Sequence, residues 1–158
     1  MRQPLRAAAV AARYLGAAAL LAVGLNHLEQ YSTEHHSAIP TIGTLFALNF
    51  VSAVLIATAL AAPVQRLPGR AGRIALPLLS AGGIGVAAGS LAGLLLSEST
   101  GLFGFAEVGY RPAIVLSIAL ELATIVLLTL HALMAGRGLA DRARPPGPRI
   151  RPRWRAQE

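Results

Sequence analysis

Four long apolar runs alternate with short polar segments along the chain. The runs cover about residues 7–28, 41–62, 74–96 and 112–135. Each is close to the roughly 20 residues that an α-helix needs to cross a bilayer. Pro40 and Pro112 stand at the starts of the second and fourth runs, where a missing N–H removes no helical hydrogen bond. The pattern predicts an all-α integral membrane four-helix bundle, with residues 1–135 as a single transmembrane domain.

The first run is less uniform than the others, because it contains one charged residue, Arg13. The long side chain of arginine can extend back to the membrane interface. Arg2 and Arg6 precede the run, so a cleaved signal peptide is the alternative interpretation. The run is long for the apolar region of a signal peptide, and no clear Ala-x-Ala site closes it. We therefore expect a retained first span, with Arg13 at the inner rim and His27 just below the outer rim.

Composition and charge support the same class of protein. Hydrophobic residues make up 54% of the sequence and charged residues 13%, and the mean hydropathy is +0.58. All fourteen basic residues are Arg, and all but Arg111 lie near the N-terminus, in the link at 63–73 or in the C-terminal segment. Positively charged links mark the cytoplasmic side. We expect a multi-pass plasma-membrane protein with both termini in the cytoplasm, and no nucleic-acid partner, because the Arg clusters flank apolar runs.

The C-terminal segment, residues 136–158, differs in composition from the rest of the chain. It holds seven Arg and four Pro with almost no apolar anchor. This composition predicts a disordered cytoplasmic tail that is attracted to anionic lipid headgroups. The alternative is that the tail only sets the orientation of the spans.

Small residues recur every fourth position in two of the runs. The third run has such a stripe at Ala81, Gly85, Gly89 and Gly93. The second run repeats the spacing at Asn49, Ala53, Ala57 and Ala61. Small side chains let neighbouring helices approach closely in a membrane. We expect both stripes to pack within the bundle, and the alternative for the glycine stripe is a homodimer.

Two polar residues lie deep inside the predicted spans. Asn49 is eight residues into the second span and Glu121 nine into the fourth, about 12 to 14 Å from the outer boundary at ~1.5 Å per residue. A charge at that depth costs about 3 kcal/mol on insertion scales, so Glu121 should face the bundle interior. Ser117 and Thr124 share its helix face and are candidate hydrogen-bond partners. A neutral Glu121 bonded to Asn49 would be structural, whereas together with His27 the same residues would form a proton or ligand site.

Possible metal ligands gather near the outer end of the first span: His27, Tyr31, Glu34, His35 and His36. Such O and N ligands suit several metals, but their spacing matches no specific motif, and we expect no metal. A b-type haem needs two axial ligands at one depth. His27 and His131 lie near opposite rims and do not meet that condition. The absence of cysteine excludes thiolate ligands and disulfides, and we expect no cofactor.

Two segments carry a resemblance to a known group of proteins. They are SAIPTIGTLFALNF at 37–50, preceded by His27 and Leu28, and LFGFAEVGYRPAIV at 102–115. The chain from Gly24 to Ala135 resembles small four-helix integral membrane proteins of high-GC Gram-positive bacteria, a group without an established function. The resemblance implies a plasma-membrane location and assigns no activity and no functional residue.

The sequence contains no nucleophile–base pair, phosphate loop or metal motif. We therefore expect no enzymatic activity, and favour a non-enzymatic accessory or sensing subunit, with a membrane-protein partner or a second copy as possible partners. The alternative is transport of protons or a small polar solute, or assistance to a redox or metal partner, through Glu121, Asn49 and His27.

Overall fold

The computed structural model describes residues 2–33, 38–104, 109 and 111–143. Every regular element among these residues is a helix: α1 (Arg2–Thr33), α2 (Pro40–Ala61), the short 3-10 helix η2 (Val64–Arg66), α3 (Gly69–Ser99) and α4 (Pro112–Ala143). The four α-helices are each long and apolar enough to cross a membrane. The predicted all-α fold with four helices of spanning length is confirmed.

Three of the helices extend beyond the predicted spans. α1 runs through Thr33, α3 begins at Gly69, and α4 continues to Ala143. Backbone N–H and C=O groups gain from helical pairing outside the apolar run as well, so hydrophobicity alone does not set a helix end. Residues 136–143, which were predicted to begin a disordered tail, are therefore helical. Residues 144–158 lie outside the described part of the chain.

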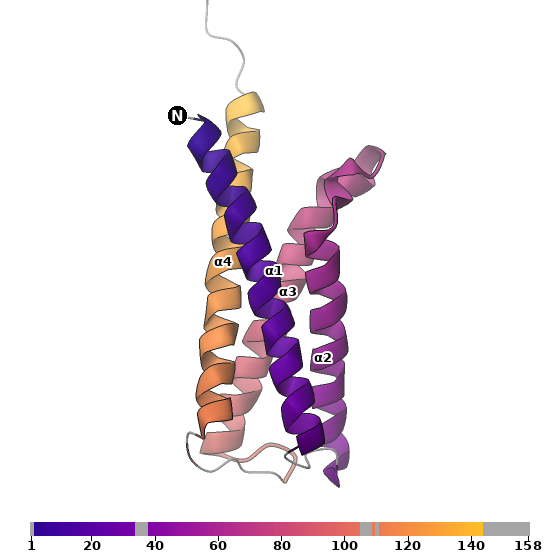
Figure 1. The fold of residues 1–158 in the computed structure, drawn as a ribbon, viewed down its shortest axis with the longest axis vertical. Helices are drawn as coiled ribbons and strands as arrows, with labels where there is room; N and C mark the ends of the chain where they lie inside the picture. The colour runs from indigo at the N-terminus through magenta and orange to yellow at the C-terminus, as the bar shows by residue number, and fades with distance from the viewer. Residues whose placement is uncertain (1, 34–37, 105–108, 110, 144–158) are drawn as a thin grey trace, which may run out of the picture.

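The four helices run alternately up and down around a common core (Figure 1). α1 packs most extensively, against α4 on one side and α2 on the other, and α3 packs on α4. Contact between α2 and α3 is sparser than these, although the two helices are joined through η2. The N-terminus of α1, the C-terminal end of α4 and the α2–α3 link lie at the same end of the bundle (Figure 1).

The apolar core lies in the half of the bundle that contains these ends. Its buried residues come from three helices: Ala17, Leu20, Ala53, Ala57, Leu60 and Leu128. Ala53 and Ala57 belong to the small-residue stripe predicted for the second span, and both are buried. Ala61, the last position of that stripe, is exposed. The small side chains of Ala53 and Ala57 let α2 approach α1 closely.

The glycines that permit close helix packing are not those of the predicted stripe. A Cβ added to Gly24 would lie 2.9 Å from the Cβ of Ala53, and one on Gly83 would lie 2.7 Å from a methyl carbon of Leu128. A Cβ on Gly85 or Gly89 would meet no atom within 4 Å. Gly83 and Gly85 point to opposite faces of α3, because two residues turn an α-helix by about 200°. Within this chain the packed face is the one that carries Gly83.

Arg13 is buried, with 4% of its surface exposed. Its Nε donates to the carbonyl oxygen of Leu60 at 2.6 Å, and one terminal nitrogen donates to that of Ala62. The other terminal nitrogen donates to the Gln65 side chain at 3.2 Å. The last carbonyls of a helix have no partner in their own helix and carry partial negative charge. Arg13 therefore caps the C-terminal end of α2.

Candidate functional site

A cavity of about 340 Å³ lies in the other half of the bundle, and all four long helices contribute to its wall. Its polar lining residues are His27, Gln30, Asn49, Ser52, Ser90, Ser97, Ser117 and Glu121. Its apolar lining residues are Ile42, Leu45, Phe46, Leu48, Val86, Leu94, Leu102 and Ile114. Three glycines of the predicted stripe, Gly85, Gly89 and Gly93, also line it, whereas Ala81 does not. The absence of side chains along this face of α3 leaves room for the cavity.

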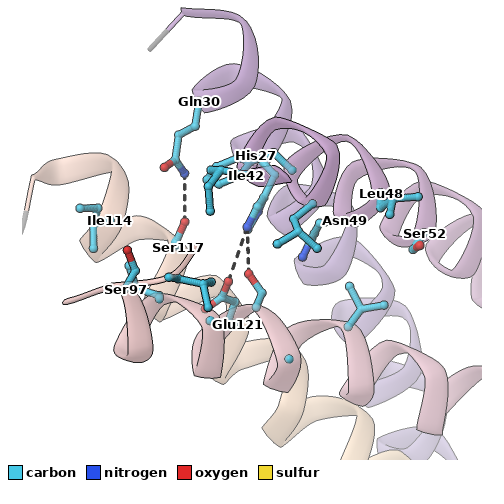
Figure 2. A pocket seen from close by; sticks show the side chains of 18 of the residues that line it. His27, Gln30, Ile42, Leu48, Asn49, Ser52, Ser97, Ile114, Ser117 and Glu121 are labelled. Atoms are coloured by element: carbon cyan, nitrogen blue, oxygen red, sulfur yellow. Dashed lines mark hydrogen bonds and ion pairs between the residues drawn. The ribbon is translucent and has the colours of Figure 1, made fainter. Parts of the chain in front are cut away.

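His27 and Glu121 meet at the inner wall of the cavity, from α1 and α4 (Figure 2). The Nε2 atom of His27 lies 4.0 Å from Oε1 of Glu121 and 2.9 Å from Oγ of Ser90. Ser90 also forms a side-chain hydrogen bond with Glu121. The Phe46 ring packs beside the imidazole, with ring centroids 5.1 Å apart. The hydroxyl of Ser90 thus links a buried imidazole to a buried carboxyl group.

The contact made by the other imidazole nitrogen, Nδ1, limits which atoms of His27, Ser90 and Glu121 can carry a hydrogen. Nδ1 of His27 lies 2.9 Å from the carbonyl oxygen of Val23. A carbonyl can only accept, so Nδ1 carries a hydrogen and donates it. With a neutral imidazole, Nε2 accepts from Ser90, and Ser90 can accept from a protonated Glu121. With an imidazolium, both bonds reverse and Glu121 is a carboxylate, so the group as a whole is neutral in either arrangement.

Two buried oxygen atoms of residues that line the cavity have no hydrogen-bond partner among the described residues. They are Oε2 of Glu121 and Oδ1 of Asn49. Glu121 has only 1% of its surface exposed. Leaving a buried polar atom unpaired costs about 1–3 kcal/mol, and more for a charged group. Because both residues line one cavity, a bound molecule with a hydrogen-bonding group can satisfy these oxygens after a small rotation of each side chain.

A second polar cluster ties α1 to α4 beyond Glu121. Nδ2 of Asn26 donates to Oγ of Ser117 at 2.5 Å, and Nε2 of Gln30 donates to the same oxygen at 3.2 Å (Figure 2 shows the second bond). Asn26 also reaches the carbonyl oxygen of Ala113 at 3.4 Å. These bonds hold the outer wall of the cavity in place without using Glu121.

The predicted partners of Glu121 therefore need correction. Ser117 accepts from α1, and the Thr124 hydroxyl donates to the Leu120 carbonyl of its own helix at 2.8 Å. A threonine hydroxyl within a helix readily bonds to the carbonyl four residues earlier. No described hydrogen bond joins Asn49 to Glu121, and both keep an unpartnered oxygen instead. The carboxyl group pairs with Ser90 and approaches His27.

Sequence reasoning missed Asn26, Gln30 and Ser90 as members of the site. Asn26 and Gln30 are four residues apart, and their spacing from the buried Val23 places all three on one helix face. That periodicity was a usable signal. Ser90 lies in a run rich in Gly and Ala, and nothing in the local pattern distinguishes it from a serine that packs against a neighbouring helix.

His131, the second histidine weighed above as a haem ligand, does not join this site. His131 lies in the opposite half of the bundle, where its Nδ1 donates to the carbonyl oxygen of Ala9 at 2.9 Å. His35, His36 and Glu34 lie outside the described residues. Within the described ranges, no three His, Asp or Glu side chains gather closely enough to hold a metal ion.

No protein-family model, curated protein or solved structure matches the sequence. The resemblance to small membrane proteins of high-GC Gram-positive bacteria stays a prediction. Fold and site together define a class by geometry: a four-helix bundle of spanning length with a buried His–Ser–Glu group facing a largely apolar cavity.

Proposed function

We propose that this chain is a multi-pass plasma-membrane protein, with both termini in the cytoplasm, that binds a small molecule in its cavity. It acts as a non-enzymatic sensing or accessory subunit. Four helices of spanning length and the distribution of Arg support the location. The observation that carries the binding function is Oε2 of Glu121, a deeply buried oxygen without a partner, on a residue that lines a cavity of about 340 Å³. That volume is near the lower end of the ~300–1,000 Å³ range of small-molecule sites.

The position of the cavity favours binding over transport through the bundle. A transported proton or solute would have to pass from Glu121 towards the end where Arg13 lies. The apolar core stands in that path, with Leu20, Leu60 and Leu128 fully buried. Polar groups in an apolar layer are costly to desolvate. A site that ends against such a layer retains a molecule more readily than it conducts one.

The proposed orientation predicts the sides of two positions. A reporter fused after Glu158 should report the cytoplasm, and one inserted after Gly101 should report the outside. Alkaline phosphatase and green fluorescent protein fusions provide opposite signals for the two compartments. A C-terminal reporter that is active outside the cell would contradict the four-span arrangement.

Binding can be tested by blocking the cavity with one side chain. Gly89→Leu places a bulky side chain where an added Cβ meets nothing within 4 Å, so the helix should keep its fold while the cavity is filled. Native mass spectrometry of protein released from membranes should detect a small-molecule adduct on the wild type. The adduct should be reduced at least tenfold in Gly89→Leu.

Gly136→Leu is the matched control, because Gly136 is also helical and open but does not line the cavity. This variant should keep the wild-type adduct, and both variants should keep the wild-type elution volume in detergent. Equal adducts on all three proteins, or none on any of them, would argue against a ligand in the cavity.

A further inference from the structure

We infer that the ligand is a neutral, membrane-soluble molecule with a hydroxyl head, and that it enters sideways from the bilayer between α2 and α3. The inference rests on the binding function proposed above and specifies the chemistry of that same site. Three features of the cavity carry it: where the wall is exposed, which polar atoms lack partners, and how charge is distributed around them.

The exposed part of the wall faces away from the bundle axis. Leu45 and Leu48 on α2 are exposed, and so are Gly85 and Gly89 on α3. All four lie within segments long and apolar enough to span a membrane. The helices that carry them make the sparser contact described above. In a bilayer the gap between α2 and α3 at these four residues faces acyl chains. A molecule dissolved in the lipid therefore reaches the cavity without crossing water.

The unpartnered atoms specify a head that can donate hydrogen bonds. Oδ1 of Asn49 is an acceptor, and Oε2 of Glu121 is an acceptor whenever the carboxyl group is ionised or carries its proton on the other oxygen. A hydroxyl group donates one hydrogen and accepts others, so it suits either proton arrangement of the His27 group. A pure hydrocarbon would leave both oxygens unpaired, at the cost given above.

The charges around the cavity favour a neutral head. Its ionisable lining residues are Glu121 and His27, which compensate each other when both are charged. Arg13 is bonded to the end of α2, beyond the apolar core. An anionic head would lie beside a carboxyl group, with no cation other than His27 among the described lining residues to offset it, and a cationic head would lie beside the imidazole.

The remaining lining accommodates an apolar body. Leu45, Phe46, Val86 and Leu94 line the cavity around the polar atoms. At about 30 Å³ per water-sized group, 340 Å³ holds on the order of ten such groups. A compact head with a short hydrocarbon portion fits inside, while a longer tail can extend through the gap into the lipid.

A photoreactive alcohol provides the direct test. The full chain in phosphatidylcholine nanodiscs would be labelled with a decanol analogue bearing an aliphatic diazirine, and the labelled peptides mapped by mass spectrometry. Decanol, decylamine, decanoic acid and decane would compete at equal concentration in the membrane. We expect labelling on the cavity walls of α2 and α3. Decanol should compete at least tenfold better than each of the other three.

Variants separate this inference from the binding function itself. Gly89→Leu and Gly85→Leu should each abolish cavity labelling, while Gly136→Leu should retain it. Asn49→Leu should lower the advantage of decanol over decane, because it removes one of the two unpartnered oxygens. Glu121→Gln should preserve that advantage, because the amide still donates and accepts.

The possible results of the labelling experiment test the hydroxyl head, its charge and the cavity separately. If Gly89→Leu blocks labelling but decane competes as well as decanol, the hydroxyl head is wrong and the binding site remains. Stronger competition by decylamine or decanoic acid would replace the neutral head with a charged one. If both leucine variants fold and still label like the wild type, the cavity is not the site, and the proposed function fails together with the inference.

Discussion

Replacing Arg13 with Met is expected to destabilise the folded protein by about 2–4 kcal/mol, which corresponds to the loss of one or two charge-assisted hydrogen bonds at ~1.5–3 kcal/mol each. The guanidinium group donates hydrogen bonds to the carbonyl oxygens of Leu60 and Ala62 and to the side chain of Gln65. Met keeps the apolar stem but leaves the end of α2 without its cap. Unfolding in mixed detergent micelles, followed by circular dichroism, measures the difference in free energy.

Arg6→Met is the control for that measurement. Arg6 lies on the same helix two turns earlier and is exposed, and the substitution removes the same charge. It should change the free energy of unfolding by less than about 0.5 kcal/mol, as expected for an exposed site. Equal losses in the two variants would mean that the positive charge near this end matters and the cap does not.

Gly24→Leu is expected to destabilise the bundle by about 3 kcal/mol or more, at the upper end of the range for overpacked sites. A Cβ at this position already lies 2.9 Å from the Cβ of Ala53 and 3.4 Å from the carbonyl oxygen of Phe50. Neither atom can move away by a rotamer change, since one is attached directly to the backbone and the other belongs to it. The larger side chain must push α1 and α2 apart.

Gly85→Leu is the matched substitution for this comparison. It should be neutral or stabilise the protein by up to about 1 kcal/mol, because the Cβ meets no atom and leucine favours a helix more than glycine. The same unfolding titration tests both variants. If Gly85→Leu were as harmful as Gly24→Leu, the face of α3 that carries Gly85 would be a packing surface, as a homodimer through the glycine stripe would require.

The contrast between the two glycines bears on function as well as stability. A bundle that needed every small residue for packing would have no room between α2 and α3. Here the tight contacts lie at Gly24 and Gly83, and the glycines at 85 and 89 border the cavity. Close packing in one half of the bundle thus coexists with space in the other.

The number and type of the helices follow from the sequence by itself. Runs of about 20 apolar residues separated by polar links are a local property, and the backbone must be helical wherever such a run crosses hydrocarbon. The inward orientation of Glu121 was predictable for the same reason, since a carboxyl group facing lipid is costly. His27, a candidate from the sequence, borders the cavity beside Glu121.

Tertiary structure alone decided which groups meet. Successive residues are rotated by about 100° around the axis of an α-helix. The spacing of residues within one helix therefore does not determine which neighbouring helix each side chain faces. That is why Glu121 pairs with Ser90 and approaches His27 rather than Asn49, and why Arg13 caps α2. Small residues repeat on more than one face of α3, and only the packing of α4 and α1 selects the face at Gly83 and leaves the other to line a cavity.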